Sequence, residues 1–360
     1  MLDFASALYL GFDHASRELR PWTQFTTGFP AAFAAPSVAR AVATELAAIQ
    51  GCERSTLGPS TLHLVWDLFG IFAARQPAIF LDGGTYPVAR WGVERAVARG
   101  STLTTFRHHD AQALRQAFVP QRKAHSWPVI VTDGFCPSCG RPAPIGDYAE
   151  IAREGSGMLM VDDTQALGIF GGSPRPAAPY GTGGGGMLRY AQLRESHVVL
   201  ICSLAKAFGV PLAVLSGSRT LVEQFEERSE SRMHSSPPSI PALHAAEGAL
   251  QRNREDGDAT RLRLARLVQH FRRRMHETGV VLNESQFPVQ TLAPSPQLDS
   301  VELHSGLLRN GVRAVLHRTH HDRRPRVSLL ITAKHKAEEI DRAVELLSRL
   351  ARAPLVFATR

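Results

Sequence analysis

Short apolar segments alternate with helix-like segments between Ser60 and Gly217, and this alternation limits the possible folds more than any other feature of the sequence. The apolar segments have the length and composition of buried strands. They are Ala78–Leu81, Leu103–Phe106, Pro128–Thr132, Met158–Val161, Val198–Cys202 and Leu212–Leu215. The helix-like segments begin at Ser60, after Pro87, at Asp110 and at Gly146. Strands that alternate with helices predict an α/β fold, with a mostly parallel central sheet and helices on both faces.

The regions on either side of this block have a different pattern. A helix-like segment of residues 36–50 precedes it, with Pro36 at its start and Gly51 after its end. Long charged helical patterns follow it, together with a strand-like segment at Arg326–Ile331. We therefore expect an N-terminal arm and helix in residues 1–50, a large cofactor-binding α/β domain in 51–235 and a small C-terminal α+β domain in 236–360.

The composition is that of a soluble globular protein. The 360 residues are 44% hydrophobic and 21% charged, and Lys+Arg 41 against Asp+Glu 33 gives a net charge of +8. Four cysteines are too few for a disulfide framework, and the longest apolar stretch, Val198–Gly217, is interrupted by lysine, glycine and proline. The first residues carry an acid where a signal peptide carries positive charge. We expect a cytoplasmic protein without a membrane segment.

Lys206 is a candidate nucleophile. It lies in SLAKAFG, between two apolar strand-like segments, and it is one of only four lysines in the chain. Burial lowers the pKa of a lysine and favours the neutral amine that forms Schiff bases. The alternative is a loop lysine whose ammonium group reaches the solvent, and this segment alone leaves both interpretations open.

Asp162 is a candidate partner for a cofactor ring. The apolar segment MLMV ends in the two carboxylates of Asp162 and Asp163. Acids at the carboxyl ends of buried parallel strands project into the crevice where open α/β sheets bind ligands. A carboxylate there can keep the pyridine nitrogen of pyridoxal phosphate protonated, so that the ring withdraws electrons. The alternative role for either acid is to cap the next element.

Two further segments suit a phosphate and a planar ring. Ser60 and Thr61 of LGPSTLH lie at the start of a helix, where free N–H groups and the helix dipole bind anions. Both residue types are also ordinary N-caps. Tyr86 of GGTYP follows a predicted strand and can stack on a ring, although a buried structural tyrosine fits the same pattern.

Two other features have ordinary explanations. Cys136 and Cys139 form a CxxC, but no second CxxC or HxxxH completes four ligands, so we expect no metal. The basic segment Arg318–Arg326 lacks interleaved aromatic residues, and we interpret it as a solvated loop rather than a nucleic-acid site.

Five motifs together resemble the α-oxoamine synthase family of fold-type I pyridoxal-phosphate enzymes, whose members join an acyl-CoA to an amino acid with loss of carbon dioxide. The similarity extends from about residue 100 to about residue 345. TFRHHD (105–110) is similar to the family's FRHND, VTDGF (131–135) to VTEGV, VDDTQALGIFG (161–171) to VDEAHGTGVFG, SLAKAFGVPLAV (203–214) to the Schiff-base lysine motif, and RVSLLITAKH (326–335) to RLRISLTAAH. Order and spacing agree throughout.

The resemblance implies roles for individual residues. Lys206 would form the Schiff base and move protons at the substrate Cα atom. Asp162 would pair with the pyridine nitrogen, and Ser203 would contact the phosphate. Arg326 would bind the carboxylate of the amino-acid substrate through two parallel hydrogen bonds.

The resemblance also implies a homodimer, because Ser235 and Ser236 match a segment that reaches the cofactor of the neighbouring subunit. At Gln165 the family has a histidine near the ring hydroxyl, and at Pro137 it has a serine. LGPSTLH and TYP look more like the equivalent segments of aminotransferases. Three functions therefore stay open: acyl transfer from an acyl-CoA or acyl-carrier thioester, transamination, and a catalytically silent protein that binds a partner. The presence of both Lys206 and Asp162 argues against the silent protein.

Overall fold

The computed structural model describes residues 1–122, 127–295, 298–318 and 324–352. The chain forms two compact units. The larger unit comprises Phe12–Cys136 and Pro142–Asp258, and the smaller unit comprises Met1–Gly11, Pro137–Arg141 and Ala259–Arg360. The division at residues 50 and 235 that we expect from sequence stays a prediction.

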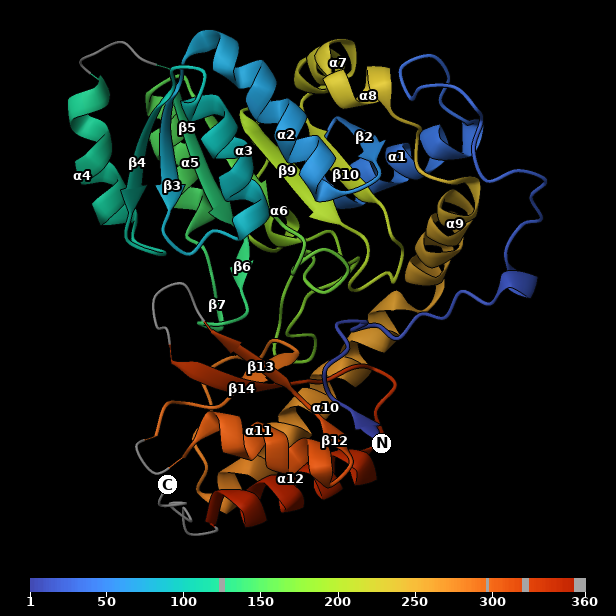
Figure 1. The fold of residues 1–360 in the computed structure, drawn as a ribbon, viewed down its shortest axis with the longest axis vertical. Coiled ribbons are helices and arrows are strands. Elements are labelled where there is room, and N and C mark those ends of the chain that lie inside the picture. The colour runs from blue at the N-terminus through green and yellow to red at the C-terminus, as the bar shows by residue number, and fades with distance from the viewer. Residues whose placement is uncertain (123–126, 296–297, 319–323, 353–360) are drawn as a thin grey trace, which may run out of the picture. The chain divides into compact units, whose positions relative to one another are not determined.

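A seven-stranded sheet forms the centre of the larger unit (Figure 1). Its order is β2 (Arg54–Gly58), β10 (Ala213–Gly217), β9 (Val198–Ser203), β8 (Met158–Asp162), β5 (Pro128–Asp133), β3 (Ala78–Asp82) and β4 (Thr102–Phe106). Among these seven strands, β10 alone runs in the direction opposite to the other six. The predicted mostly parallel α/β sheet is therefore confirmed, and β2 is a strand that the sequence pattern did not predict.

Helices cover both faces of this sheet, as predicted. One face packs against α2 (Thr61–Phe72), α3 (Pro87–Val97) and α7 (Arg219–Arg228), and we call it the α2 face. The opposite face packs against α1 (Ser37–Gln50), α4 (Ala111–Arg122) and α5 (Ile145–Glu154), and we call it the α5 face.

Side chains alternate between the two faces along each strand. In β3, Ile79 and Leu81 belong to the core beneath α2 and α3. Phe80 lies between them and points the other way, with its ring 5.9 Å from that of Phe118 in α4. Whether a residue occupies an odd or an even position along its strand, its parity, therefore decides which face of the sheet its side chain reaches.

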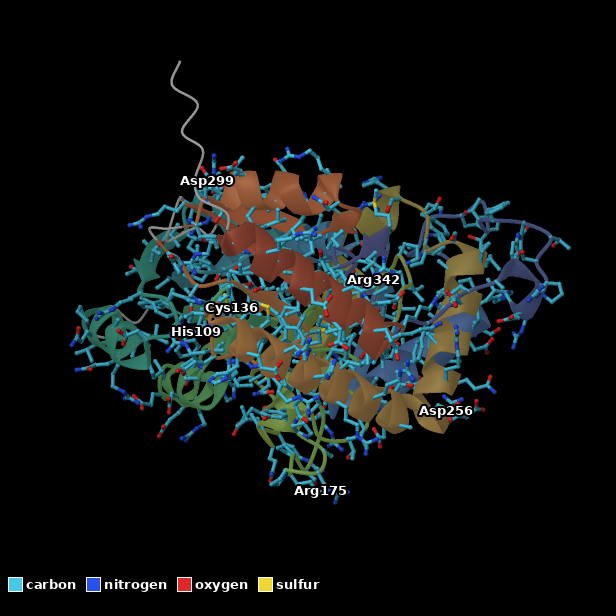
Figure 2. The ribbon with its side chains drawn as sticks, turned by 90° about the horizontal axis from the view of Figure 1, so that it is seen from below. His109, Cys136, Arg175, Asp256, Asp299 and Arg342 are labelled. Atoms are coloured by element: carbon cyan, nitrogen blue, oxygen red, sulfur yellow. The ribbon has the colours of Figure 1, made fainter. Side chains whose placement is uncertain are left out.

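The remaining elements of the larger unit are short, apart from one long helix. They are η1 (Ser16–Glu18), η2 (Ala73–Arg75), β6 (Phe135–Cys136), α6 (Met187–Tyr190), α8 (Glu230–His234) and α9 (Ile240–Glu255). The long connection between β8 and α6 includes the exposed Arg175 (Figure 2). It ends at Gly186, whose φ of +87° and close approach to the Asp163 carboxylate leave no room for a Cβ atom.

The smaller unit contains a three-stranded antiparallel sheet in the order β11 (Val289–Thr291), β14 (Pro325–Leu330) and β13 (Val315–Arg318). Its helices are α10 (Gly257–Thr278), which begins two residues before this unit, α11 (Ser300–Arg309) and α12 (Ala337–Arg352). The strand β7 (Arg141–Pro142) lies at the boundary of the two units. Residues 319–323 of the predicted basic loop lie outside the described residues.

The first residues of the chain belong to the smaller unit. Strand β1 (Leu2–Asp3) pairs in parallel with β12 (Val312–Arg313). The Phe4 ring stacks on His335 with 4.3 Å between ring centroids, and His335 Nε2 donates a hydrogen bond to the Asp3 carbonyl (3.0 Å). Within the described residues, no helix is both long enough and apolar enough to cross a membrane.

Candidate active site

The predicted site residues of the larger unit gather at the carboxyl edge of its sheet. Because β2, β3, β5, β8 and β9 run in the same direction, their carboxyl ends meet at one edge. Asp162 ends β8 and Ser203 ends β9, with Lys206 three residues further on. Open parallel sheets bind their ligands at this edge.

Lys206 lies close enough to Asp162 for their charges to interact. Burial lowers the pKa of Lys206, and the negative charges of Asp162 and Asp133 partly offset this effect. The side chain is half-buried, so the ammonium group loses much of its hydration. The arrangement favours a neutral amine beside two carboxyl groups, which is what Schiff-base chemistry requires.

Asp162 is 6% exposed and projects from β8 on the α2 face. Burial raises its pKa, whereas hydrogen bonds from Thr164 and the charge of Lys206 oppose that rise. The Thr164 main-chain N–H donates to Asp162 Oδ1 at 3.0 Å. Together with the hydrogen bond from the Thr164 side chain, this bond fixes the orientation of the carboxylate.

Asp163 is also buried but has different neighbours. Its Oδ2 atom accepts a hydrogen bond from the main-chain N–H of Met187 (2.8 Å), the first residue of α6. Burial raises the pKa of Asp163 to about 8, although the Met187 hydrogen bond opposes the rise. When Asp163 is ionised, it raises the pKa of the Cys52 and Cys202 thiols. Asp163 therefore supports a helix start, the capping role that the sequence had left open for either acid.

The start of α2 offers main-chain N–H groups. Ser60 is its N-cap, but the Ser60 side chain does not cap the helix and instead lies 2.9 Å from His63 Nδ1. Thr61 is the first helical residue. The first turn therefore keeps donors for an anion, as the sequence predicts for Ser60 and Thr61.

Tyr86 is the N-cap of α3 and its side chain is 57% exposed, so it is not the buried structural tyrosine that was the alternative. Its main-chain N–H donates to both carboxyl oxygens of Asp133, at 3.1 and 3.2 Å. Asp133 is not among the site residues predicted from the sequence. The signal was present, because Asp133 ends a buried apolar strand in the same way as Asp162.

A second group of polar residues surrounds Asp82 on the α5 face. His108 Nδ1 donates to Asp82 Oδ1 at 2.6 Å, and the N–H groups of Gly84 and His109 donate at 2.8 and 3.0 Å. Burial opposes ionisation of Asp82, but these hydrogen bonds together hold its pKa below the usual value. These hydrogen bonds connect the end of β3 with the residues that follow β4. They give His108, the first histidine of FRHHD, a structural role.

The comparison with protein families matches most of this chain. The model for aminotransferase class I and II matches residues 49–347. The chain belongs to that family. Within this aminotransferase class I and II family, curated relatives include 8-amino-7-oxononanoate synthase from Methylococcus capsulatus, 28% identical over 313 residues that cover 86% of this chain and 76% of the relative. The same enzyme from Nitrosococcus oceani is 27% identical over 305 residues, which cover 84% of this chain and 77% of the relative.

Solved structures share the fold. A serine palmitoyltransferase from S. paucimobilis, with a bound PLP–myriocin aldimine, has a TM-score of 0.83 at 15% identity and covers 97% of this chain and 87% of its own. The 8-amino-7-oxononanoate synthase from Francisella tularensis has a TM-score of 0.75 at 16% identity and covers 97% of both chains. These comparisons confirm a fold-type I, pyridoxal-phosphate-dependent transferase that is similar to the α-oxoamine synthases.

The residues of this family member fit pyridoxal phosphate. The half-buried Lys206 can bind its aldehyde, the Asp162 carboxylate can bind its ring nitrogen, and the uncapped start of α2 can bind its phosphate. Ser203 ends β9, and its N–H donates to Thr164 Oγ1 at 3.0 Å. Gln165 is half-buried in the loop after Asp162.

The predicted phosphate residues Ser235 and Ser236 follow α8. The Ser235 hydroxyl donates to the Ser231 carbonyl at 2.6 Å, and Ser236 is exposed. Asp67 of α2 holds this helix, because its Oδ2 atom accepts hydrogen bonds from the hydroxyl of Ser229 and from the N–H of Ser231 (3.1 Å).

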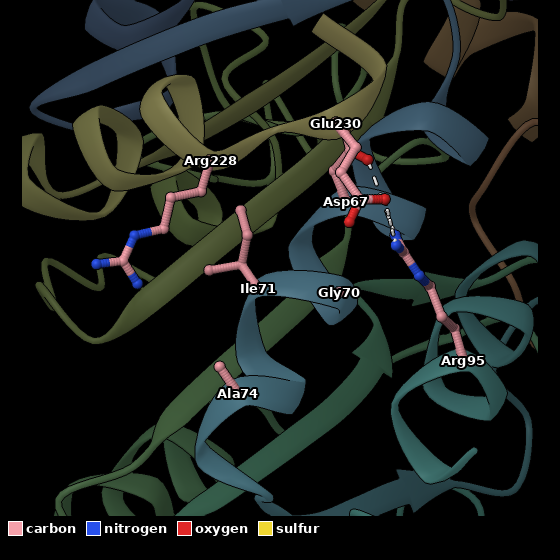
Figure 3. A pocket seen from close by; sticks show the side chains of 7 residues that line it. All are labelled: Asp67, Gly70, Ile71, Ala74, Arg95, Arg228 and Glu230. Carbon is pink, nitrogen blue, oxygen red and sulfur yellow. Dashed lines mark hydrogen bonds and ion pairs between the residues drawn. The ribbon is translucent and has the colours of Figure 1, made fainter. Parts of the chain in front are cut away.

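Arg95 of α3 holds α8 from the other side. It donates to Glu230 at 2.6 Å and lies over the Trp66 ring at 4.5 Å. Arg95, Glu230 and Asp67 line a cavity of about 190 Å³ (Figure 3). The segment that carries the two serines is therefore attached to two helices of the α2 face.

Arg326, the predicted ligand of the substrate carboxylate, belongs to the smaller unit. It is half-buried on β14, opposite His317 of β13. Burial lowers the pKa of His317, and the positive charge of Arg326 lowers it further. Ser328, two residues along the same strand, accepts or donates a hydrogen bond with Thr291 at 2.8 Å.

Proposed function

We propose that this protein transfers an acyl group from an acyl-CoA or acyl-carrier thioester to the Cα atom of an amino acid, with loss of the amino-acid carboxylate as carbon dioxide. The observation that carries the proposal is the group of Lys206, Asp162 and Ser203 on one face of the carboxyl edge. The similarity to 8-amino-7-oxononanoate synthases supports this reaction over others of the same fold.

Each residue of the group has a chemical task. Pyridoxal phosphate, when bound, supplies a ring that withdraws electrons from the substrate Cα atom. Lys206 would bind the aldehyde and afterwards take and return protons at Cα, and its lowered pKa favours the neutral amine that accepts a proton. Asp162 holds a proton on the ring nitrogen.

The neighbouring residues orient the ligand. Ser60, Thr61 and Ser203 bind the phosphate, through the start of α2 and through the loop before Lys206. The exposed Tyr86 ring stacks on the cofactor. Gln165 donates a hydrogen bond to the ring hydroxyl but cannot give up a proton, so acid catalysis at that oxygen is not available from this residue.

Arg326 binds the substrate carboxylate in this proposal. A planar guanidinium group forms two parallel hydrogen bonds with a carboxylate. Transamination is the second candidate, because Gln165 and the Tyr86 segment differ from the synthase pattern.

We also propose a cytoplasmic homodimer whose interface includes the outer surfaces of α2 and α3. Leu62, Trp66 and Trp91 are 41%, 45% and 48% exposed, and large apolar groups on the surface of paired helices indicate a contact with another protein. In the dimer, Ser235 and Ser236 would contact the phosphate of the partner's cofactor.

The purified protein, loaded with pyridoxal phosphate, provides the test. It is incubated with single amino acids, with and without an acyl-CoA, and the release of thiol and of carbon dioxide is measured. A synthase releases both only when both substrates are present. Conversion of the cofactor to its amine form by an amino acid alone, with release of a keto acid, would identify an aminotransferase instead.

A further inference from the structure

Asp133 is the carboxyl group of this site that the motifs leave without a role. It ends β5 and is the register partner of Asp162 in β8. Paired residues of neighbouring parallel strands project to the same face of the sheet. Asp133 and Asp162 therefore both lie on the α2 face, and both carboxyl groups are close enough to Lys206 to influence its pKa.

The hydrogen bonds of Asp133 go to the start of α3. Its Oδ1 and Oδ2 atoms lie 3.1 and 3.2 Å from the main-chain nitrogen of Tyr86, which donates to both. The next residue, Pro87, has no N–H group, so the Tyr86 N–H is the last main-chain donor before α3 begins. This contact fixes the main chain that carries the exposed Tyr86 ring.

The charges around Asp133 favour its neutral form. Asp162 and Asp82 are the acids that act on it, and His108 and Lys206 are the bases. His108 is already bonded to Asp82. Burial raises the pKa of Asp133 well above its usual value, and the Asp162 carboxylate raises it further, while the hydrogen bond from the Tyr86 N–H offsets only part of this rise. Two carboxyl groups that share a site repel each other when both are ionised, so the pKa of one of them is raised.

We propose that Asp133 is a positioning residue that acts as an uncharged carboxyl group: it holds the Tyr86 main chain and leaves Asp162 as the single anion on the α2 face. The inference rests on the proposed function, since that function assigns Tyr86 and Asp162 to the cofactor. Asparagine keeps an oxygen that accepts the Tyr86 N–H and matches a neutral carboxyl group in size. Alanine removes the acceptor.

The experiment compares Asp133→Asn with Asp133→Ala in two measurements. Hydrogen–deuterium exchange of the peptide that ends at Tyr86, in the protein without cofactor, reports the contact itself. Titration with pyridoxal phosphate at neutral pH, followed by the visible absorption of the bound cofactor, reports its dissociation constant. Asp82→Asn is the contrasting variant, because it removes a carboxylate that the structure holds ionised, and it should lower the melting temperature more than Asp133→Asn does.

We expect Asp133→Asn to keep the exchange rate at Tyr86 and the dissociation constant of pyridoxal phosphate within about twofold of wild type. Asp133→Ala should speed exchange at Tyr86 and weaken cofactor binding about five- to tenfold, the effect of one lost hydrogen bond. Unchanged exchange in Asp133→Ala would overturn the contact, and weakened cofactor binding in Asp133→Asn would overturn the neutral form. If wild type binds no pyridoxal phosphate, the proposed function fails, while the exchange measurement still tests the contact.

Discussion

The two faces of the sheet's carboxyl edge carry the same residue types and use them differently. On the α2 face, Asp133 and Asp162 lie near Lys206, and the main chain satisfies only part of their hydrogen-bonding capacity. On the α5 face, Asp82 and Asp163 bind main-chain N–H groups at the starts of turns and helices. The difference indicates that the position of an acid along its strand, rather than its residue type, decides which groups it meets.

Asp162 and Asp163 show this most directly, because they are neighbours in sequence. A shift of one residue would exchange their faces, since side chains alternate along a strand. If only the α2 face carries the reaction, substitutions on that face should reduce activity far more than substitutions on the α5 face.

Removing the amine of the α2 face should have the largest effect. Lys206→Ala should abolish covalent attachment of the cofactor and reduce turnover by at least about a thousandfold, because no other group can move protons at the substrate. Mass spectrometry after borohydride reduction should find a cofactor adduct on the wild type and none on the variant. Lys336→Ala, which removes an exposed lysine, is the control and should retain the adduct. An adduct of equal yield in Lys206→Ala would place the Schiff base elsewhere.

Substitutions of the two adjacent acids should have different effects on activity. Asp162→Asn should lower kcat by roughly two to four orders of magnitude, because the ring nitrogen loses the group that keeps it protonated. Asp163→Asn should lower kcat by less than about tenfold, since the amide still accepts the Met187 N–H. Steady-state kinetics of both variants at one pH would decide this, and the reverse order would assign catalysis to the α5 face.

Arg326→Lys tests a residue that belongs to neither face. A lysine cannot reproduce the two parallel hydrogen bonds of a guanidinium group, so binding of the amino acid should weaken by about 2 to 3 kcal/mol. The absorption spectrum of the bound cofactor should stay unchanged. Spectroscopic titration with the amino acid measures both effects, and wild-type affinity in the variant would mean that another group binds the carboxylate.

The pH dependence of stability should reveal the buried acid of the α5 face. The pKa of Asp163 is about 8 in the folded protein and about 4 in the unfolded chain, so the folded state holds the proton more tightly. The contribution of Asp163 to the free energy of unfolding is therefore fully present below about pH 4, and it is lost as the pH rises toward 8. Asp163→Asn lacks this loss and should gain at least about 2 kcal/mol relative to wild type between pH 5 and pH 8. If denaturation shows the same difference in stability between Asp163→Asn and wild type at pH 5 and at pH 8, Asp163 is not neutral in the folded protein.

Much of the larger unit could be predicted from local patterns. Apolar segments of strand length and the helices between them indicate a parallel sheet, and acids at strand ends point to its ligand edge. Asp133 ends a buried strand as Asp162 does, but it was not predicted as a site residue. Its position beside Asp162 depends on the pairing of β5 with β8, a strand that begins 25 residues further along the chain.

Strand β2 shows why the rest could not be predicted. Its residues Arg54, Ser55 and Thr56 are polar, so the segment does not have the pattern of a buried strand. It is buried because β10, more than 150 residues later, pairs with it. The hydroxyl groups of Ser55 and Ser216 then satisfy each other at 2.7 Å.

The sequence by itself determined the α/β architecture and pointed to Lys206 and Asp162 as the central residues of the proposed site, because strand periodicity and motif spacing are local properties of the chain. Tertiary structure alone decided that Asp133 pairs with Asp162, that Asp163 points away, and that β1 pairs with β12. Register between distant strands is set by which faces can be buried together, and that information is spread over the whole chain.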